Sequence, residues 1–464
     1  MTEMINIKYQ TKLFVVAVFT MIATCSCKKF VEIKTSPNLI GADAAFDNDN
    51  TALATVNGVY IQMRSLGTYF TNAGLSIFLS LSADEIYNTS ANATYDPFLK
   101  NELLATTSSL SGNFWSQAYR IIYRSNAIME GLQTGKNLSD GVKKQLLGEM
   151  KLVRALHYFY LVNLFGDVPL VTSTDYTVNS KMPRTAVADV YQQIITDLRE
   201  AQNDLNTAYP VSGKIRPNKW AATALLSRVY LYVHDWENAE AESSSILNSG
   251  VYSLVNNLNN VFLKNSAETI WEIASANESS NTSQGAMFIP SSTTSRPAFA
   301  ATTSLLNSFE VNDQRKANWL KSNVVSGVTY YYPYKYKVRS GTTATENLVV
   351  FRLGEQYLIR AEAKAQRNDL QGALADLNVV RNRAGLTSIN TGTKDVILET
   401  IRKERFTELF TEWGDRWLEL KRAGIADAIL LPLKGSGWQT TDQLYPLPQS
   451  ELDINVFLTQ NPGY

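Results

Sequence analysis

Apolar residues recur at three- and four-residue steps through most of the chain from Ala44 onward, and this period restricts the fold more than any other feature. It is clearest over residues 144–165, where it stops at the turn Gly-Asp-Val-Pro. No run of regularly spaced alternating strands accompanies it, so the sequence predicts a mainly α fold. Further helices are expected over residues 187–205, 219–234, 349–367, 370–383 and 396–421.

Two of the expected helical hairpins share a pattern. The segments VYLYVHDWENAEAE and AEAKAQRNDLQGALAD each contain a helix, a polar turn, and then Asp, an apolar residue and Ala. Asp235 and Ala239 in the first match Asp369 and Ala373 in the second, and a small Ala lets adjacent helices approach closely. The pattern resembles the tetratricopeptide helix-turn-helix repeat. Chance similarity of two amphipathic hairpins is the alternative.

Two long stretches lack the helical period. Residues 88–113 and 275–303 are crowded with small polar residues and include several aromatic ones. Long irregular segments on a rigid scaffold commonly carry binding sites. We therefore expect a tetratricopeptide-like helical hairpin scaffold with long irregular loop insertions, and we expect the functional site in these loops.

The N-terminus has the pattern of a lipoprotein signal. Basic residues precede an apolar run at 13–23 that is too short to cross a bilayer, so residues 1–26 are expected to be a signal peptide. Ser26 precedes Cys27, as lipidation of that cysteine requires, whereas Thr24 before the rival Cys25 fits less well. Because both cysteines of the chain lie here, the rest of it forms no internal disulfide. Residues 27–43 are then a lipidated tether.

The charge pattern argues against nucleic acid as a partner. The 43 basic residues balance 43 acidic ones, and neither sign forms a long block. Catalytic motifs are also missing: His157 and His234 are the only histidines, and neither belongs to a HExxH metal site. We expect both to pack in helices, and we expect no metal, no cofactor and no enzymatic activity. The rival is glycoside hydrolysis by loop carboxyls, for which the candidates are Asp84, Glu85, Glu310 and Asp313.

The segment GEMKLVRALHYFYLVNLFGDVPLV at residues 148–171 closely resembles the signature helix of the SusD/RagB family. Ordered similarity continues through PRTAVADVYQQIITDL, IRPNKWAATALLSRVYLY, FRLGEQYLIRAEAKA and ADLNVVRNRAGL. It closes with IRKERFTELFTEWGDRWLELKR, YPLPQSEL and QNPGY. The chain is therefore similar to this family over nearly all of its length beyond the predicted signal.

The resemblance implies a SusD-like α/α superhelix over residues 44–464, with an N-terminal part at about 44–260 and a C-terminal SusD/RagB part at about 261–464. It implies a glycan-binding lipoprotein anchored in the outer membrane, which delivers oligosaccharide to a SusC-like TonB-dependent transporter. A peptide-binding RagB-like protein of the same architecture is the alternative. Lys28 and Lys29 follow the lipidation site where acidic residues would favour outward display, so anchoring is better supported than exposure on the cell exterior.

Charged residues of the motifs are expected to pair across packed helices, because a lone buried charge is costly. These scaffold residues are Arg154, Arg352, Glu355, Arg360, Glu362, Arg381, Glu404, Arg405, Glu408 and Arg416.

Ligand residues follow from the chemistry of sugars. Pyranose rings present apolar C–H faces that pack on aromatic rings, while their hydroxyls need fixed polar partners. The loops and the Tyr330-Tyr331-Tyr332 run contain that mixture. The predicted ligand-binding residues are Asp84, Tyr87, Asn88, Tyr95, Phe98, Phe288, Arg296, Phe299, Trp319 and Tyr331.

Overall fold

The computed structural model describes residues 42–64, 70–275 and 280–464, and divides the chain into two units, residues 1–45 and 46–464. In the first unit the described residues form the short helix α2 (Ala42–Ala45). The predicted signal peptide and Cys27 lie outside the described residues, as does the predicted tether up to residue 41. Among the described residues, no helix has the length and apolar character needed to span a bilayer.

Helices dominate the second unit, so the prediction of a mainly α fold is confirmed. The longer helices are α3 (Asp49–Met63), α4 (Leu75–Ser82), α6 (Ser116–Thr134), α7 (Asp140–Phe165), α9 (Val187–Asp204), α10 (Lys219–Tyr232), α11 (Trp236–Leu247), α15 (Leu353–Gln366), α16 (Leu370–Arg383), α17 (Lys394–Leu409), α18 (Asp415–Arg422) and α19 (Ala426–Lys434). The short ones are α5 (Asp96–Lys100), α8 (Tyr176–Asn179), α12 (Ser283–Phe288), α13 (Thr303–Ser308), α14 (Gln314–Trp319) and α20 (Gln449–Ile454).

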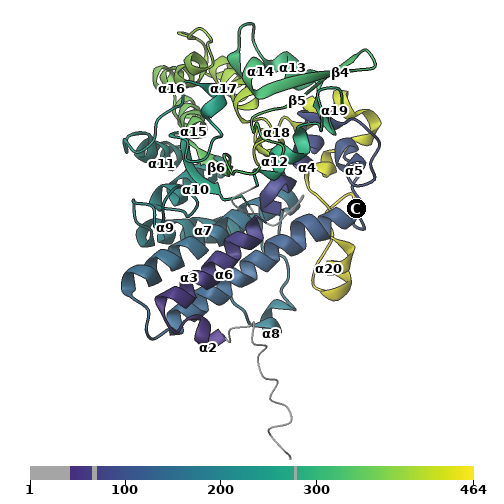
Figure 1. Cartoon of the computed structure of the whole chain (residues 1–464). Coiled ribbons are helices and arrows are strands. Elements are labelled where there is room, and N and C mark those ends of the chain that lie inside the picture. Colours follow the sequence, from purple (N-terminus) through teal and green to yellow (C-terminus); the bar gives the residue numbers. More distant parts are fainter. Residues whose placement is uncertain (1–41, 65–69, 276–279) are drawn as a thin grey trace, which may run out of the picture. The chain divides into compact units, whose positions relative to one another are not determined.

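Consecutive long helices pack on one another. In Figure 1, α3, α6 and α7 run side by side, and the series continues through α9, α10, α11, α15 and α16. The reason is visible in α9, where Val190, Ile194, Leu198 and Ala201 are buried at steps of three or four residues and form one apolar stripe. Each helix thus buries its stripe between its neighbours, as in a stack of helical hairpins.

The two predicted hairpins have the same turn. His234 and Asn368 have positive φ angles of 60° and 66°. The next residues, Asp235 and Asp369, donate their backbone N–H groups to the carbonyls of Tyr230 and Lys364, both at 2.9 Å, and their carboxylates cap the following helices.

The alanines after these turns are also equivalent. Ala239 and Ala373 are both fully buried. The repeat is therefore confirmed, although α10 ends at Tyr232 and leaves His234 in the turn rather than in the predicted helix.

Among the described residues, short strands form three two-stranded antiparallel sheets. These are β1 (Ile86–Asn88) with β3 (Phe299–Ala301), β2 (Thr269–Ile273) with β6 (Leu348–Arg352), and β4 (Leu320–Val325) with β5 (Val328–Pro333).

The helix expected over residues 349–367 is wrong in its first turn. Residues 348–352 are a fully buried strand because the run Leu-Val-Val-Phe suits a pleated surface, and the helix starts only at Leu353.

The single helix expected over residues 396–421 is also wrong, because it is interrupted between α17 and α18. Thr411, Trp413 and Gly414 have positive φ angles, which a continuous α-helix does not allow. Gly414 is needed there, since a Cβ atom would lie 2.2 Å from a side-chain carbon of Leu79. The break therefore lets α4 approach the C-terminal helices.

The stretches expected to be irregular contain short elements. Residues 88–113 include α5 and the start of a π-helical turn (Leu110–Trp115), and the described part of 275–303 includes α12 and β3. The remaining helical turns are Phe70–Gly74, Leu258–Asn260, Gly435–Gly437 and Thr440–Gln443. These segments pack over the helical scaffold and carry several of the predicted ligand residues.

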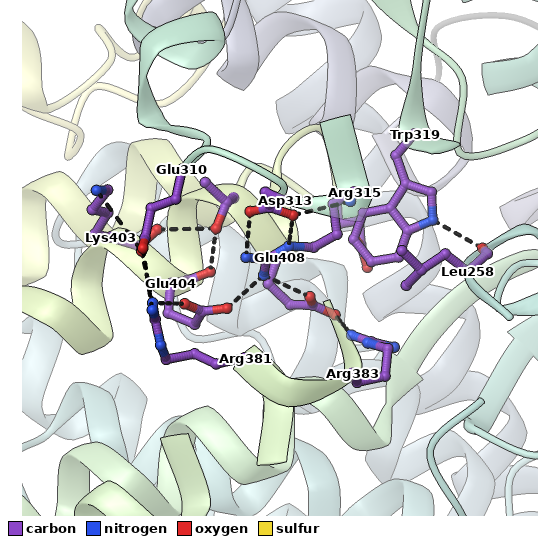
Figure 2. A network of polar contacts seen from close by, with 12 residues as sticks. Leu258, Glu310, Asp313, Arg315, Trp319, Arg381, Arg383, Lys403, Glu404 and Glu408 are labelled. Atoms are coloured by element: carbon purple, nitrogen blue, oxygen red, sulfur yellow. Dashed lines mark hydrogen bonds and ion pairs between the residues drawn. The ribbon is translucent and has the colours of Figure 1, made fainter. Parts of the chain in front are cut away.

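A buried network of ion pairs joins the C-terminal helices, and Figure 2 shows Arg315 between Asp313 and Glu408. The guanidinium of Arg315 is completely buried and lies 2.8 Å from Asp313, 2.6 Å from Glu404 and 3.0 Å from Glu408. Arg352 continues the network at 2.5 Å from Glu408.

The prediction that the motif charges are scaffold residues is confirmed. All ten form ion pairs, through the contacts Arg154–Asp197, Arg352–Glu408, Arg228–Glu355, Arg360–Asp376, Arg422–Glu362, Arg381–Glu310, Arg315–Glu404, Arg405–Asp415 and Arg416–Asp84.

Candidate functional site

The ribbon of β1 and β3 brings two of the polar segments together. Asn88 pairs with Phe299 and Tyr87 pairs with Ala300, so these two pairs point to opposite faces of the ribbon. Phe299 is buried, whereas Tyr87 is only half-buried and lies near Tyr330 of β5. Burial raises the pKa of the Tyr87 phenol, and the neighbouring Tyr330 raises it further. The Tyr87 phenol therefore stays protonated and can donate and accept hydrogen bonds.

The loop after β1 is fixed by its own side chains. Asn88 Nδ2 donates to Asp96 Oδ1 at 2.6 Å and to the Ser90 carbonyl at 2.7 Å. The other carboxylate oxygen of Asp96 accepts the backbone N–H of Asn92 at 3.0 Å. Tyr95 then packs edge-on against Phe299 with a centroid distance of 4.9 Å, and it remains half-buried. Asn88 is therefore a residue that shapes the loop, while Tyr95 keeps part of its surface accessible.

The segment before β3 contacts this loop. Exposed Arg296 donates from Nη2 to Ser90 Oγ at 2.8 Å. Buried Asn323 of β4 donates from Nδ2 to the carbonyls of Ser292 and Ser295, at 2.9 and 2.7 Å. The β4–β5 hairpin thus supports the chain that carries Arg296.

We call Tyr87, Arg296 and Tyr330 the tyrosine cluster; Tyr95 lies on the other face of the β1–β3 ribbon, beside Phe299. The cluster residues come from β1, the segment before β3, and β5; β1 and β5 both contact β3, and Asn323 of the β4–β5 hairpin holds the segment before β3. The cluster combines partly accessible aromatic rings with phenol and guanidinium donors. Rings of this kind pack on the apolar face of a sugar, and the donors match its hydroxyls.

Four of the predicted ligand residues belong to the core instead. Phe98, Phe288, Phe299 and Trp319 are buried, so no ring face is open to a ligand and the contact predicted for them is wrong. Trp319 is completely buried and donates its indole N–H to the carbonyl of Leu258 at 2.9 Å, as Figure 2 shows. The sequence offered little warning, because an aromatic residue in a polar segment has the same signature whether it faces inward or outward.

Asp84 is also structural, contrary to its predicted ligand role. It is buried and held by two hydrogen bonds from Arg416, at 2.7 and 3.0 Å. Its carboxylate also accepts the Ser304 hydroxyl at 2.5 Å. With these partners, the Asp84 carboxylate serves to hold β1 in place.

The Tyr330-Tyr331-Tyr332 run is divided by the alternation of β5. Tyr330 joins the tyrosine cluster, Tyr332 is buried, and Tyr331 points to the other face of the hairpin, where it is 38% exposed. Tyr331 therefore does not belong to the cluster. The Ser326-Gly327 pair is the sequence signal that could have revealed this hairpin and its alternation. In the structure these two residues form the turn, with φ angles of 50° and 78°.

The carboxyls considered for glycoside hydrolysis are held in separate structural contacts. Glu85 is buried, which raises its pKa to about 8, and it accepts hydrogen bonds from the Ser80 hydroxyl and the Thr411 amide. Asp313 binds Arg315, while Arg381 binds Glu310 and lowers its pKa. Within residues 42–64, 70–275 and 280–464, no group of three His, Cys, Asp or Glu is placed to hold a metal ion.

Comparison with known proteins gives consistent matches. Residues 44–231 match a family model described as "Starch-binding associating with outer membrane", and residues 320–464 match one described as "SusD family". SusD-like protein P25 of Formosa agariphila is 25% identical over 97% of this chain and 99% of its own length.

Solved structures have the same fold. A SusD superfamily protein from Bacteroides vulgatus superposes with a TM-score of 0.80 at 21% identity, over 90% of this chain and 100% of that one. A laminarin-binding SusD-like protein superposes with a TM-score of 0.76 at 26% identity, over the same shares of the two chains.

Proposed function

The chain belongs to the SusD/RagB family, and from this we propose that it binds an oligosaccharide at the tyrosine cluster and passes it to an outer-membrane transporter. The family is one of glycan-binding proteins associated with the outer membrane. Carbohydrate is the ligand class that this membership and the chemistry of the cluster both favour.

One observation carries the proposal. Tyr87 and Tyr330 come from strands more than 200 residues apart, yet both strands pack against β3, and the segment that carries Arg296 leads directly into β3. Core packing accounts for buried rings such as Trp319, but it does not require these half-buried phenols to gather with an exposed guanidinium. A surface on which a sugar ring stacks, with partners for its hydroxyls, accounts for both the half-buried phenols and the exposed guanidinium.

The laminarin-binding relative supports the same ligand class, because its fold matches this chain over 90% of the residues. We extend the proposal to lipidation at Cys27, to display on the cell exterior and to a SusC-like TonB-dependent transporter as the receiving partner. We also propose that the protein is not an enzyme, since its buried carboxyls serve as scaffold contacts. The ligand would then leave the site intact.

Affinity electrophoresis through gels that contain laminarin, starch, xylan, mannan, pectin or alginate tests the proposal. We expect wild-type protein to be retarded by at least one of these polysaccharides. The paired variant Tyr87→Ala, Tyr330→Ala should lose most of that retardation, because it removes two rings from the cluster. Tyr176→Ala is the matched control, since Tyr176 is 78% exposed on α8 and is not part of the cluster.

Two results would contradict the proposal. Unretarded wild-type protein that instead binds a set of oligopeptides in calorimetry would favour the peptide-binding alternative. Release of shorter oligosaccharides from a retained polysaccharide, followed by chromatography, would overturn the proposal that the protein is not an enzyme.

A further inference from the structure

The far face of the β4–β5 hairpin borders a cleft. It has a volume of about 640 Å³ and lies between β5 and the segment of residues 309–317. Small-ligand pockets have volumes of roughly 300–1,000 Å³, so the cleft is large enough for a short oligosaccharide. Tyr331 forms one wall, and none of the three residues of the tyrosine cluster lines this cleft.

Tyr331 reaches the cleft because of strand alternation. It pairs with Ser322 on β4, whereas its neighbour Tyr330 pairs with Asn323 and faces the tyrosine cluster. With 38% of its surface exposed, Tyr331 keeps part of its ring accessible. One strand therefore presents an aromatic side chain on each of its two faces.

Polar side chains line the opposite wall. Asn312 and Gln314 both border the cleft, and Ser322 lies beside Tyr331. Asn312 has a positive φ of 70°, a conformation that Asn adopts more readily than most residues other than glycine. Amide and hydroxyl groups around one accessible ring are the groups that a pyranose requires.

The charges at the cleft are already engaged by the protein. Glu310 binds Arg381 at 2.7 Å, and the ammonium group of Lys321 lies 5.0 Å from the centre of the Tyr334 ring. The Lys316 ammonium donates to the carbonyl of Leu306 at 3.1 Å. A neutral, hydroxyl-rich ligand suits this lining better than a strongly charged one.

The wall that carries Asn312 and Gln314 is rigidly supported. Figure 2 shows that residues near them in the chain join the ion-pair network, through Glu310 with Arg381 and through Asp313 with Arg315. The backbone N–H of Gln314 also donates to the carbonyl of Ala384 at 2.9 Å. The lining is therefore organised before any ligand arrives, which reduces the entropic cost of binding.

We infer that this cleft is a second carbohydrate-binding site, with Tyr331 as its stacking ring and Asn312 and Gln314 as hydroxyl partners. The inference rests on the proposed function, because it takes the ligand class from that proposal. It adds that the hairpin holds saccharide on both of its faces, so one protein molecule binds two short oligosaccharides.

Isothermal titration calorimetry tests the inference with the tetrasaccharide of whichever polysaccharide retards the wild-type protein in the gels. We expect two molecules of tetrasaccharide per wild-type protein. Tyr331→Ala should weaken binding at one of these sites by roughly 2- to 12-fold or remove it, while the other site keeps its affinity. Tyr331→Phe preserves the ring and should behave like wild type at both sites.

The reciprocal variants separate the two sites. Tyr87→Ala with Tyr330→Ala should leave the site at Tyr331 titratable, and Asn312→Gly, which tolerates the positive φ, should weaken that site alone. A single wild-type site whose affinity is unchanged in Tyr331→Ala would refute the second site and leave the proposed function standing. Wild-type protein retarded by none of the six polysaccharides would reject both.

Discussion

Arg416 holds Asp84 through two hydrogen bonds, from Nε to Oδ1 at 2.7 Å and from Nη2 to Oδ2 at 3.0 Å, although 332 residues separate the two in the chain. Both side chains are buried. The pair fastens α18 to the residues just before β1, and β1 carries Tyr87 of the tyrosine cluster. A scaffold arginine therefore fixes the position of a candidate ligand-binding strand.

Removing one partner of this pair should be strongly destabilising. Arg416→Met leaves the Asp84 carboxylate buried without its main countercharge, so we expect the free energy of unfolding to fall by about 3–5 kcal/mol. Urea denaturation measures the change. Arg402→Met is the matched control, because Arg402 pairs with the exposed Glu399 and should cost at most about 1 kcal/mol. Equal stability of the two variants would contradict the role given to Arg416.

The buried alanines of the two hairpins provide a second prediction. Ala239→Leu and Ala373→Leu each add volume at a fully buried position, so each should lower the stability by about 1–3 kcal/mol. Thermal melts detect this change. Ala241→Leu is the control on the same helix, since Ala241 is exposed and should melt like wild type. Unchanged melting of both buried variants would mean that these positions accommodate larger side chains.

Two aromatic substitutions should have opposite consequences. Trp319→Ala removes a completely buried ring and its hydrogen bond to Leu258, so we expect a loss of stability of about 3–5 kcal/mol. Tyr330→Ala should leave the melting temperature nearly unchanged and weaken glycan binding by about 0.5–1.5 kcal/mol. Differential scanning calorimetry and titration calorimetry on the same samples separate the two effects. A stable Trp319→Ala protein would argue against its place in the core.

His157 should make stability depend on pH. Burial lowers its pKa from 6.5 to about 4, so the unfolded chain binds a proton more readily than the folded protein between these values. This contribution to stability is fully present above pH 6.5 and is lost as the pH falls through 4, by about 3 kcal/mol in all. His157→Gln should therefore flatten the stability profile between pH 4 and 6.5 in urea titrations. An identical slope in the variant would show that other groups control acid unfolding.

Lipidation is tested at the N-terminus. Cys27→Ala should leave the folded body intact but release the protein from membranes, because the acyl chains supply the anchoring free energy. Membrane fractionation and labelling with radioactive palmitate measure both effects. Cys25→Ala is the matched control and should remain anchored. Label that still enters the Cys27→Ala protein would assign the anchor to Cys25.

Much of the scaffold could be predicted because its signals are local. The apolar period of α9 and the Asp and Ala positions of the two hairpins depend on residues within a few turns of one another. The secondary-structure prediction failed where two local signals indicated different elements. The run of residues 348–352 had helical spacing but β-branched and aromatic side chains, and its pairing with β2 decided in favour of a strand.

The helical class of the fold, the hairpin repeat and the scaffold role of the motif charges could all be predicted from the order of residues along the chain. Which aromatic rings remain accessible follows from the folded arrangement, because burial depends on contacts between distant segments. Phe299 is covered by Phe288 and Tyr95, whereas Tyr87, on the other face of the same ribbon, stays half-open beside Tyr330. Local sequence carries no record of such contacts, so the candidate sites became visible only when the chain had folded.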